Sequence, residues 1–539
     1  MSAFFASLAN ALLWYAPIAA ILMASRLVVL YGQLSSYQFR GWLMAFKRQW
    51  KHCFIPPCVT ALCATLVCLL FDALAQARGS HGGMYSLIGA LLIILLGYCA
   101  DIFVYRRREG KSSLKFTGRV KRLYAAMALL LLIVFYFVRR ALPYMGVNAL
   151  LILFLPAWAF LAALLVWPLE RFIYELYFRD ARKVLRNRED LTVVGITGSY
   201  GKTSVKFYLQ TLLSQKYNVL CTRQSRNTPM GVSTCIRNDL TPAHNVFIAE
   251  MGARHRGDIR ELCRLVKPQI GILTSVGPQH LETFGSIENV KKTKYDLVLA
   301  LPGDGFAVFS EDHGIVRGLY EQTGIAKAIV GDQGDDLWAE EERVDATGTA
   351  FTLCGKDGMR IACHAPVYGA HVVRNILMAA AVALKMGLTG KQIQNGVELI
   401  APIQHRFKVE TGPDGVRRIN NGFNANPVSS RQTLVELGSG RYEGRKIIVT
   451  PGFVELGREE KRFNHELGMN IAHVADLVLL IGKNHTQPIL EGLKEAGFSE
   501  SDIHTFDTLG QANAFYETIK QKGDLVLYEN DLPDQYSEV

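Results

Sequence analysis

The sequence lacks the cysteine pairs, the basic leader and the repeats that mark several protein classes. Its ten cysteines form no C-x-x-C pair, which argues against a zinc ribbon, and we expect small, buried, reduced thiols instead. No Lys or Arg precedes Arg26, so we do not expect a cleaved signal peptide, which needs a basic start. Internal repeats and low-complexity tracts are also absent. The length of 539 residues predicts three or four domains.

Acidic residues are scarce in the first third of the chain. Residues 1–188 contain 22 Lys and Arg but 6 Asp and Glu, whereas the remainder contains 37 basic and 42 acidic residues. A basic protein can bind nucleic acid. Here the excess positive charge lies among hydrophobic segments, and the rest of the chain is mildly acidic. We therefore expect no nucleic-acid partner.

Hydrophobic runs are abundant in the same region. Five of them are long enough to span a bilayer: Phe4–Leu30, Ile55–Leu74, Tyr85–Tyr105, Leu123–Val138 and Val147–Leu169. The loops Arg40–Lys51 and Arg106–Arg122 are strongly basic, and such loops face the cytoplasm. We predict an integral, multi-pass protein of the cytoplasmic membrane, with the bilayer as a partner and everything after Leu169 in the cytoplasm. A charged connector, Glu170–Asp190, is expected to follow the last span.

After the connector, short β-branched runs alternate with helical stretches. The runs are Leu191–Thr197, Asn245–Met251, Ile270–Val276, Phe306–Ser310, Lys446–Thr450, Leu477–Ile481 and Asp524–Tyr528. Strands separated by helices indicate parallel sheets. The expected fold class is therefore α/β, with three parts. A transmembrane helical bundle (1–188) precedes a P-loop α/β ATPase domain (189–401) and a smaller Rossmann-like α/β C-terminal domain (402–539).

The first of these strands leads directly into a glycine-rich loop. The loop is Gly198-Ser199-Tyr200-Gly201-Lys202-Thr203-Ser204, and a helix follows. Its backbone N–H groups can surround phosphate oxygens, Lys202 supplies a cation, and Thr203 supplies a hydroxyl for Mg²⁺. Glycine turns between strands and helices also occur without a ligand. The Gly-Lys-Thr at the start of the helix favours a nucleotide, and we predict ATP.

The residues Gly195–Ser204 resemble the phosphate loop of the Mur ligase family, G-x-x-G-x-x-G-K-T. Further stretches match in the family's order: Asn227–Gly231, Glu250–Ala253, Gln279–Ser286, Gly369–His371 with Asn375, Gln404–Arg406, Asn424–Pro427 and Glu455–Gly457. The similarity covers Leu191 to Tyr528 and is closest to the branch that adds D-alanyl-D-alanine to the muramoyl tripeptide. It implies an ATP-dependent ligase that joins a carboxylate to an amine through an acyl phosphate.

The resemblance also implies roles for individual residues. Glu250 would hold one Mg²⁺ with Thr203, and His280 would serve a second. Lys294 matches a lysine that is carbamylated in several members and then faces the metal, although a solvated basic helix face is the competing interpretation. The predicted catalytic residues are therefore Lys202, Glu250, His280 and Lys294. Outside the glycine-rich loop, the predicted nucleotide contacts are Asn227, Asn375, Arg406 and Asn421.

Three positions depart from the family's pattern. Asn421 stands where members commonly carry an Asp, which removes a negative charge near the expected ribose. Val372 stands where an Asn often follows the His. The segment Leu527–Gln535 replaces a Lys-Gly-Ser-Arg segment that helps to hold the amine substrate. The last difference implies that the amine is not D-alanyl-D-alanine held in the usual way.

The family's uridine-binding N-terminal domain is also missing, and the five hydrophobic runs stand in its place. We hypothesise that the carboxylate acceptor is lipid-linked or polymeric and is presented at the bilayer for cell-wall synthesis. The amine donor would be an amino acid or a peptide. Two alternatives stay open: a ligase of the poly-γ-glutamate type, and a non-catalytic nucleotide-binding scaffold of a wall-synthesis complex.

Overall fold

The computed structural model describes most of the chain and divides into two compact units. The described residues are 18–51, 113–141, 154–223, 226–310, 314–344, 347–368, 370–403, 408–422, 426–439 and 444–532, with scattered positions between 53 and 99 and at 151. The first unit ends at Ile173, and the second runs from Tyr174 to Leu532.

The described part of the first unit is helical. Its helices are α2 (Arg26–Leu34), α3 (Phe39–Arg48), α6 (Gly118–Ala141) and the beginning of α8 (Leu155–Arg186). Trp42 of α3 is buried, and its Nε1 donates to the Val28 carbonyl of α2 at 2.7 Å. The Arg122 guanidinium of α6 donates to both oxygens of Glu170 in α8, at 2.6 and 3.0 Å. Packing and a bidentate ion pair therefore fix these helices to one another.

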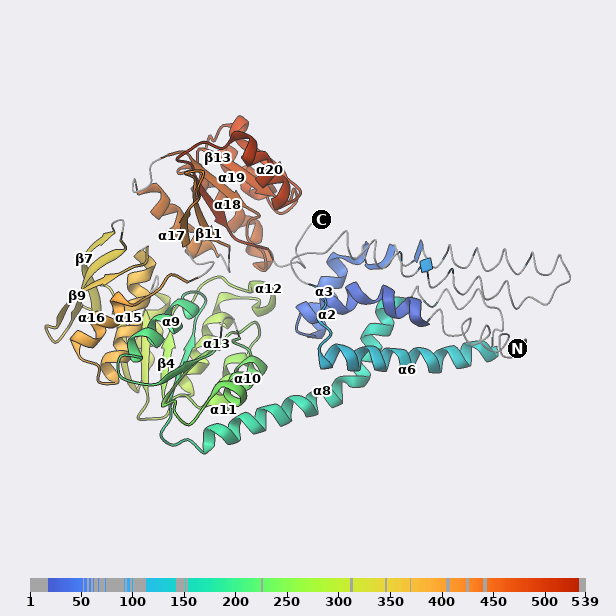
Figure 1. Cartoon of the computed structure of the whole chain (residues 1–539), viewed down its shortest axis with the longest axis horizontal. Helices are drawn as coiled ribbons and strands as arrows, with labels where there is room; N and C mark the ends of the chain where they lie inside the picture. The colour runs from blue at the N-terminus through green and yellow to red at the C-terminus, as the bar shows by residue number, and fades with distance from the viewer. Residues whose placement is uncertain are drawn as a thin grey trace. The chain divides into compact units, whose positions relative to one another are not determined.

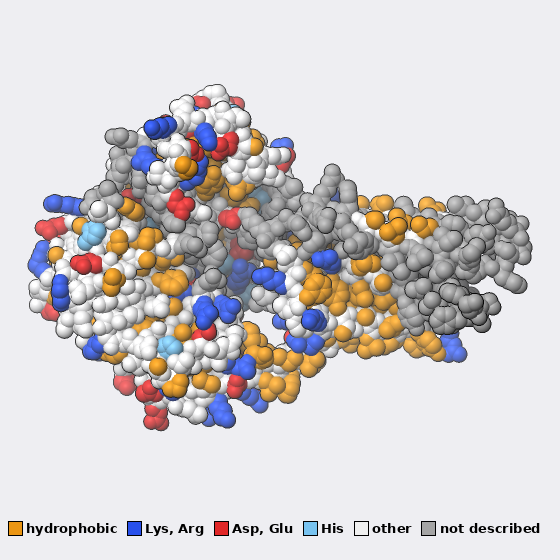
Figure 2. Space-filling model, viewed as in Figure 1, with side chains coloured by type: hydrophobic (Ala, Val, Ile, Leu, Met, Phe, Trp, Pro, Cys, Tyr) orange, Lys and Arg blue, Asp and Glu red, His pale blue; other side chains and the backbone are white. Residues whose placement is uncertain are grey.

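Two described helical segments are long and apolar enough to cross a membrane, Gly118–Val138 and Leu155–Arg186. The predicted spans at 55–74 and 85–105 lie mostly outside the described residues, as does the first half of the span at 4–30. The predicted bundle of five spans is therefore not confirmed. Hydrophobic side chains gather on the exposed surface of α6 and α8 (Figure 2), among them Phe137 at 65% exposed and Leu164 at 69%.

The helix α8 corrects one expectation. The segment Glu170–Asp190 was expected to be a connector, but the helix continues through it to Arg186. Apart from Glu170, which is paired with Arg122, most charged residues of this helical extension are exposed, so their side chains remain hydrated. Pro168 lies inside the helix, where it removes one backbone donor. The many charged residues of this segment therefore do not interrupt the helix.

The second unit begins with a nine-stranded sheet. Its strands are β1 (Thr192–Thr197), β2 (Val219–Cys221), β3 (Val246–Glu250), β4 (Ile270–Leu273), β5 (Phe306–Ser310), β6 (Ala326–Gly331), β7 (Leu337–Val344), β8 (Thr349–Gly355) and β9 (Arg360–Ala365). They lie in the order β2-β3-β1-β4-β5-β6-β7-β8-β9. The pairs from β2 to β7 are parallel, and the last two pairs are antiparallel.

Helices cover both faces of this sheet (Figure 1). They are α9 (Lys202–Leu213), α10 (Pro229–Asp239), α11 (Asp258–Val266), α12 (Leu281–Phe284), α13 (Ile287–Leu299), α14 (Ile315–Gln322), α15 (Ala370–Lys385) and α16 (Gly390–Glu398). Because neighbouring strand residues point to opposite faces, Val194 belongs to the core with α9 and α15, whereas Val193 belongs to the core with α10 and α11. Burial on both faces explains why the central strands are almost entirely apolar.

A six-stranded sheet forms the C-terminal part of the second unit. Its strands are β10 (Lys408–Thr411), β11 (Arg417–Asn421), β12 (Lys446–Thr450), β13 (Leu477–Ile481), β14 (Ile503–Phe506) and β15 (Leu525–Glu529), in the order β10-β11-β15-β12-β13-β14. Only the pair β10–β11 is antiparallel. The helices here are α17 (Pro427–Gly438), α18 (Glu460–Ala472), α19 (Gln487–Glu495) and α20 (Leu509–Ile519), with short 3-10 turns η2 (Gly457–Glu459) and η3 (Glu500–Asp502).

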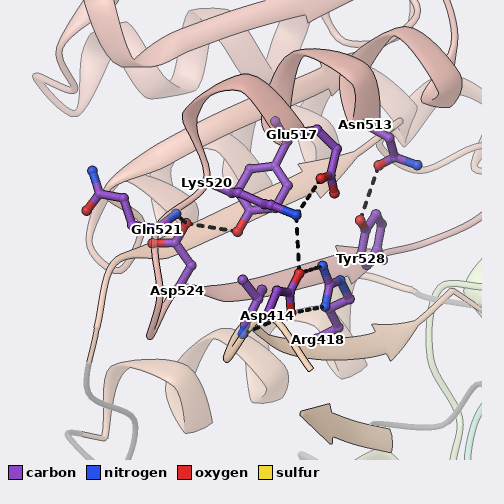
Figure 3. A network of polar contacts seen from close by, with 10 residues as sticks. Asp414, Arg418, Asn513, Glu517, Lys520, Gln521, Asp524 and Tyr528 are labelled. Atoms are coloured by element: carbon purple, nitrogen blue, oxygen red, sulfur yellow. Dashed lines mark hydrogen bonds and ion pairs between the residues drawn. The ribbon is translucent and has the colours of Figure 1, made fainter. Parts of the chain in front are cut away.

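A network of polar contacts ties the β10–β11 hairpin to the end of α20 (Figure 3). Arg418 donates to both oxygens of Asp414, at 3.1 and 2.6 Å. Lys520 lies 3.5 Å from Asp414 and 2.5 Å from Glu517. Positive and negative groups alternate, so each charge has a counter-charge. We call these four residues the balanced network.

Each of the seven predicted strands is present, and the predicted parallel pairing is confirmed. The prediction of buried thiols holds in the second unit, where all five are free and buried, but it is wrong for Cys58, which is half-buried, and for Cys99, which is exposed. Burial raises the pKa of the Cys263 thiol to about 12, so it stays protonated and inert. Cys63 and Cys68 lie outside the described residues.

Candidate active site

The glycine-rich loop connects the end of β1 to the start of α9. Gly198 has φ +154° and Gly201 has φ +82°, which favour a residue without a Cβ. A Cβ at Gly198 would collide with Thr274 Oγ1, and one at Gly201 would lie 2.8 Å from Asn375 Oδ1. Both glycines are therefore required by backbone conformation and by close neighbours.

Residues at the end of β4 hold the loop in place. Thr274 Oγ1 donates to the Tyr200 carbonyl at 2.5 Å, and Ser275 Oγ accepts from the Tyr200 amide at 2.9 Å. Ser199 Oγ donates to the Gly277 carbonyl at 3.0 Å. The sequence analysis did not select Thr274 or Ser275. Their position at the carboxyl end of the strand beside β1 was the signal that could have identified them.

Two predicted lysines end on carbonyl oxygens of the loop. Lys202 Nζ donates to Gly198 O at 2.6 Å and to Ser199 O at 3.2 Å, and Lys294 Nζ donates to Gly198 O at 2.8 Å. Lys294 is buried, so it is not the solvated helix position that competed with the functional interpretation. Burial, assisted by the nearby charge of Lys202, holds the pKa of Lys294 well below its ordinary value.

Glu250, the last residue of β3, contacts three polar side chains, two from α9 and one from the segment before α10. Thr203 Oγ1 of α9 lies 3.2 Å from both of its carboxylate oxygens, and Asn227 Nδ2 donates to Oε1 at 3.1 Å. Lys206 Nζ, which the sequence analysis did not select, donates to Oε2 at 3.0 Å. Mg²⁺ prefers oxygen ligands, and a hydroxyl beside a carboxylate supplies them. The residues Thr203 and Glu250 therefore fit one Mg²⁺.

His280 pairs with a residue of the C-terminal part. Its Nδ1 contacts the carboxylate of Glu455, and the Glu282 amide donates to the Glu455 carbonyl at 3.1 Å. Both His280 (φ +51°) and Glu455 (φ +65°) adopt the left-handed conformation. Burial lowers the pKa of His280, against the opposing effect of Glu455.

This environment favours a neutral imidazole at His280 that donates through Nδ1 and leaves Nε2 as an acceptor. Among the described residues, no group of three or more His, Cys, Asp and Glu side chains gathers to hold a metal. The second Mg²⁺ at His280 stays a prediction.

The other predicted nucleotide contacts have different surroundings. Asn375 is buried on α15 beside Gly201. Arg406 lies outside the described residues, as does Asn424. Asn421 donates to Thr433 Oγ1 at 3.1 Å and to Glu529 Oε2 at 2.9 Å.

Asn421 lacks the negative charge that an Asp would carry there, but the carboxyl group of Glu529 lies beside it on the adjacent strand. The register of β11 and β15 places Asn421 opposite Glu529. Ser430 Oγ donates to the other oxygen of Glu529, and burial raises the pKa of Glu529 to about 7.

The structure thus brings together most of the residues that the sequence selected. Thr203, Asn227 and Glu250 meet at one edge of the sheet, and Lys202 and Lys294 meet at the neighbouring loop. Ser204 lies in the same first turn of α9. Glu455 belongs to a matched motif but received no role, because its contact with His280 joins residues 175 positions apart.

Comparison with known protein families points to the part of the chain that contains the glycine-rich loop and Glu250. A family model described as the Mur ligase middle domain matches residues 196–383. The UDP-N-acetylmuramoyl-tripeptide–D-alanyl-D-alanine ligase of Mycobacterium bovis is 32% identical over 326 residues, which cover 58% of this chain and 64% of that protein. The Escherichia coli protein of the same name is 29% identical over 348 residues, covering 62% and 76%.

A solved structure is also similar. The MurF ligase of Thermotoga maritima, in complex with ADP, superposes with a TM-score of 0.59 at 26% identity, covering 66% of this chain and 80% of that one. The chain spans less than two thirds of the length of the M. bovis relative.

Proposed function

Because the chain carries a Mur ligase middle domain, we propose that it is an ATP-dependent ligase that joins a carboxylate to an amine through an acyl phosphate. The observation that carries this proposal is the contact of Glu250 with Thr203, one residue after Lys202 in a glycine-rich loop. The same loop carries two lysine ammonium groups on its carbonyls. That arrangement suits a triphosphate and its metal ion.

Each residue of the loop has a part in this reaction. Lys202 exchanges its two carbonyl partners for phosphate oxygens, and the backbone N–H groups of residues 201–203, at the start of α9, bind the remaining oxygens. Thr203 and Glu250 would hold Mg²⁺, which would supply positive charge to the transferring phosphoryl group. The acceptor carboxylate takes the γ-phosphate, and the amine then displaces it to form the amide. Phosphate and ADP are the other products.

Lys294 has a second possible state in this proposal. Its lowered pKa increases the fraction of neutral amine, and a neutral amine adds to carbon dioxide with loss of one proton to form a carbamate. The carbamate would replace a cation beside Gly198 with an anion that can face a metal. His280, oriented by Glu455, would then serve the second Mg²⁺.

The acceptor in this proposal is lipid-linked or polymeric and belongs to cell-wall synthesis. The exposed apolar surfaces of α6 and α8 support membrane anchorage, because water disfavours contiguous apolar surface of this kind. Lys115, before α6, and Lys121, in its first turn, are among the basic residues expected on the cytoplasmic side. The amine would be an amino acid or a peptide.

The test is ADP release by the full-length protein in detergent or nanodiscs, with a lipid-linked and a UDP-linked muramoyl peptide supplied separately with candidate amines. The proposal predicts release that requires both acid and amine, and that occurs with the lipid-linked acceptor. Turnover with the UDP-linked acceptor alone would contradict the membrane-presented substrate. Nucleotide binding without any acid- and amine-dependent release would instead favour the scaffold, for which Asn421 and the altered segment after β15 are the supporting observations.

A further inference from the structure

Lys206 is a buried cation that the proposed reaction does not use. It lies one helical turn after Lys202 on α9, and its side chain is completely buried. The ammonium donates to Glu250 Oε2 at 3.0 Å and lies 4.5 Å from the centre of the Phe207 ring. Burial of a lysine is costly unless the charge is compensated. The charge of Lys206 is compensated by the carboxylate of Glu250, the same group that fits Mg²⁺.

The charges around the phosphate loop are unequal before a nucleotide binds. Three lysines contact the loop or Glu250, namely Lys202, Lys206 and Lys294. Glu250 is the one acidic side chain in these contacts. Even with Lys294 neutral, the cations outnumber the carboxylate. A divalent cation that arrives alone therefore meets a carboxylate whose charge Lys206 already balances, whereas a triphosphate brings negative charge of its own.

We propose that Lys206 is a positioning residue that balances the charge of Glu250, so that this site holds a divalent cation only together with a triphosphate. Glu250 keeps its carboxylate directed at Thr203 and Asn227 through the contact with Lys206. The metal ligand is thus preformed but not free to trap a cation. This inference rests on the proposed function, because it assumes a metal–nucleotide site at the loop.

The test measures Mn²⁺ binding to the full-length protein by electron paramagnetic resonance of the free ion, with and without a non-hydrolysable ATP analogue. The wild type is expected to bind Mn²⁺ at least roughly tenfold more weakly without the analogue. Lys206→Met and Lys206→Gln remove the balancing charge, so each is expected to bind Mn²⁺ alone roughly ten- to a hundredfold more tightly than the wild type. Lys206→Arg, which keeps the charge, is expected to resemble the wild type.

Lys216→Met is the matched control, because Lys216 is exposed and donates to the main-chain carbonyl of Gly387 at 2.9 Å. It should leave Mn²⁺ binding unchanged. Melting curves identify any variant that does not fold, and Lys206→Gln retains a donor for Glu250 if the Met variant fails.

Three outcomes would overturn the inference. The first is tight Mn²⁺ binding by the wild type without nucleotide. The second is unchanged, weak binding of Mn²⁺ alone by folded Lys206→Gln or Lys206→Met. The third is tight binding of Mn²⁺ alone by folded Lys206→Arg, whose charge is retained. Failure of the wild type to bind the analogue at all, with or without Mn²⁺, would instead refute the proposed function.

Discussion

At the phosphate loop three lysines meet one carboxylate, whereas in the balanced network of the C-terminal part Asp414, Arg418, Glu517 and Lys520 alternate in sign (Figure 3). The members of the network are partly exposed, and each charge is already paired. Two of the loop lysines end on neutral carbonyls instead. Such carbonyl contacts can be exchanged for contacts with the oxygens of an anion. The loop is therefore arranged for a bound anion, and the network for the fold itself.

The largest effect that would test this contrast is expected at Lys202. Lys202→Met removes the cation that the proposal assigns to the phosphate oxygens, so ADP release should fall by about a thousandfold. The melting temperature should change little, because the contacts of Lys202 with Gly198 and Ser199 are hydrogen bonds to loop carbonyls. Lys520→Met, from the balanced network, should leave ADP release unchanged. Equal loss of activity in both variants would show that the contrast is wrong.

Glu529 lies between the two cases of paired and unpaired charge. It is buried, and among the described residues its carboxyl accepts hydrogen bonds from two neutral groups, Asn421 and Ser430. Its pKa is about 7 in the folded chain and near 4.5 when unfolded, so the folded state binds the proton more tightly. The contribution of Glu529 to stability should therefore be greatest below about pH 4.5, fall as the pH rises to about 7, and stay constant above.

Glu529→Gln should abolish that slope and stabilise the protein at pH 8 by about 3 kcal/mol relative to the wild type. Denaturant unfolding at pH 5 and pH 8 measures both quantities. A wild type whose stability does not fall between these pH values would contradict the assignment.

Glu455 tests whether a residue of the C-terminal part takes part in the site. Glu455→Gln weakens the acceptor for His280 Nδ1, and kcat/KM for ATP should fall by about 10- to 100-fold. Glu459→Gln is the control, since Glu459 pairs with exposed Arg462 at 2.8 Å. If the two variants had identical kinetics, Glu455 would have no part in the reaction.

The smallest effect is expected at Asp414. The Arg418 guanidinium beside it holds the pKa of Asp414 well below its usual range, but exposed pairs contribute little to stability. Asp414→Asn should lower the melting temperature by about 1–3 °C and leave nucleotide affinity unchanged. A measurable loss of nucleotide affinity would contradict the separation of the two groups of charges.

Much of the second unit could be predicted because its signals are local. Each buried strand is a short β-branched run, and the loop at 198–203 follows its strand directly. Glu250 could be placed near Thr203 because the carboxyl ends of parallel strands share one edge. Strands β7–β9 were missed, since their edge positions are half polar.

Contacts between distant segments were harder to foresee. Lys206 was not selected from the sequence, because its burial depends on Glu250, 44 positions later. The pairing of Asn421 with Glu529 depends on a strand register that no local pattern encodes. The chain before 113 is mostly beyond the described residues, so the predicted spans there stay predictions.

The close approach of Gly198 to Thr274 restricts how this sequence can evolve. Every replacement of Gly198 adds a Cβ that meets the Thr274 hydroxyl, and shortening Thr274 would still leave the Ser275 amide 2.9 Å from that atom. No second substitution at 274 can therefore rescue a first one at 198. Position 198 is therefore expected to accept only glycine, and a change of nucleotide preference would have to arise at other positions.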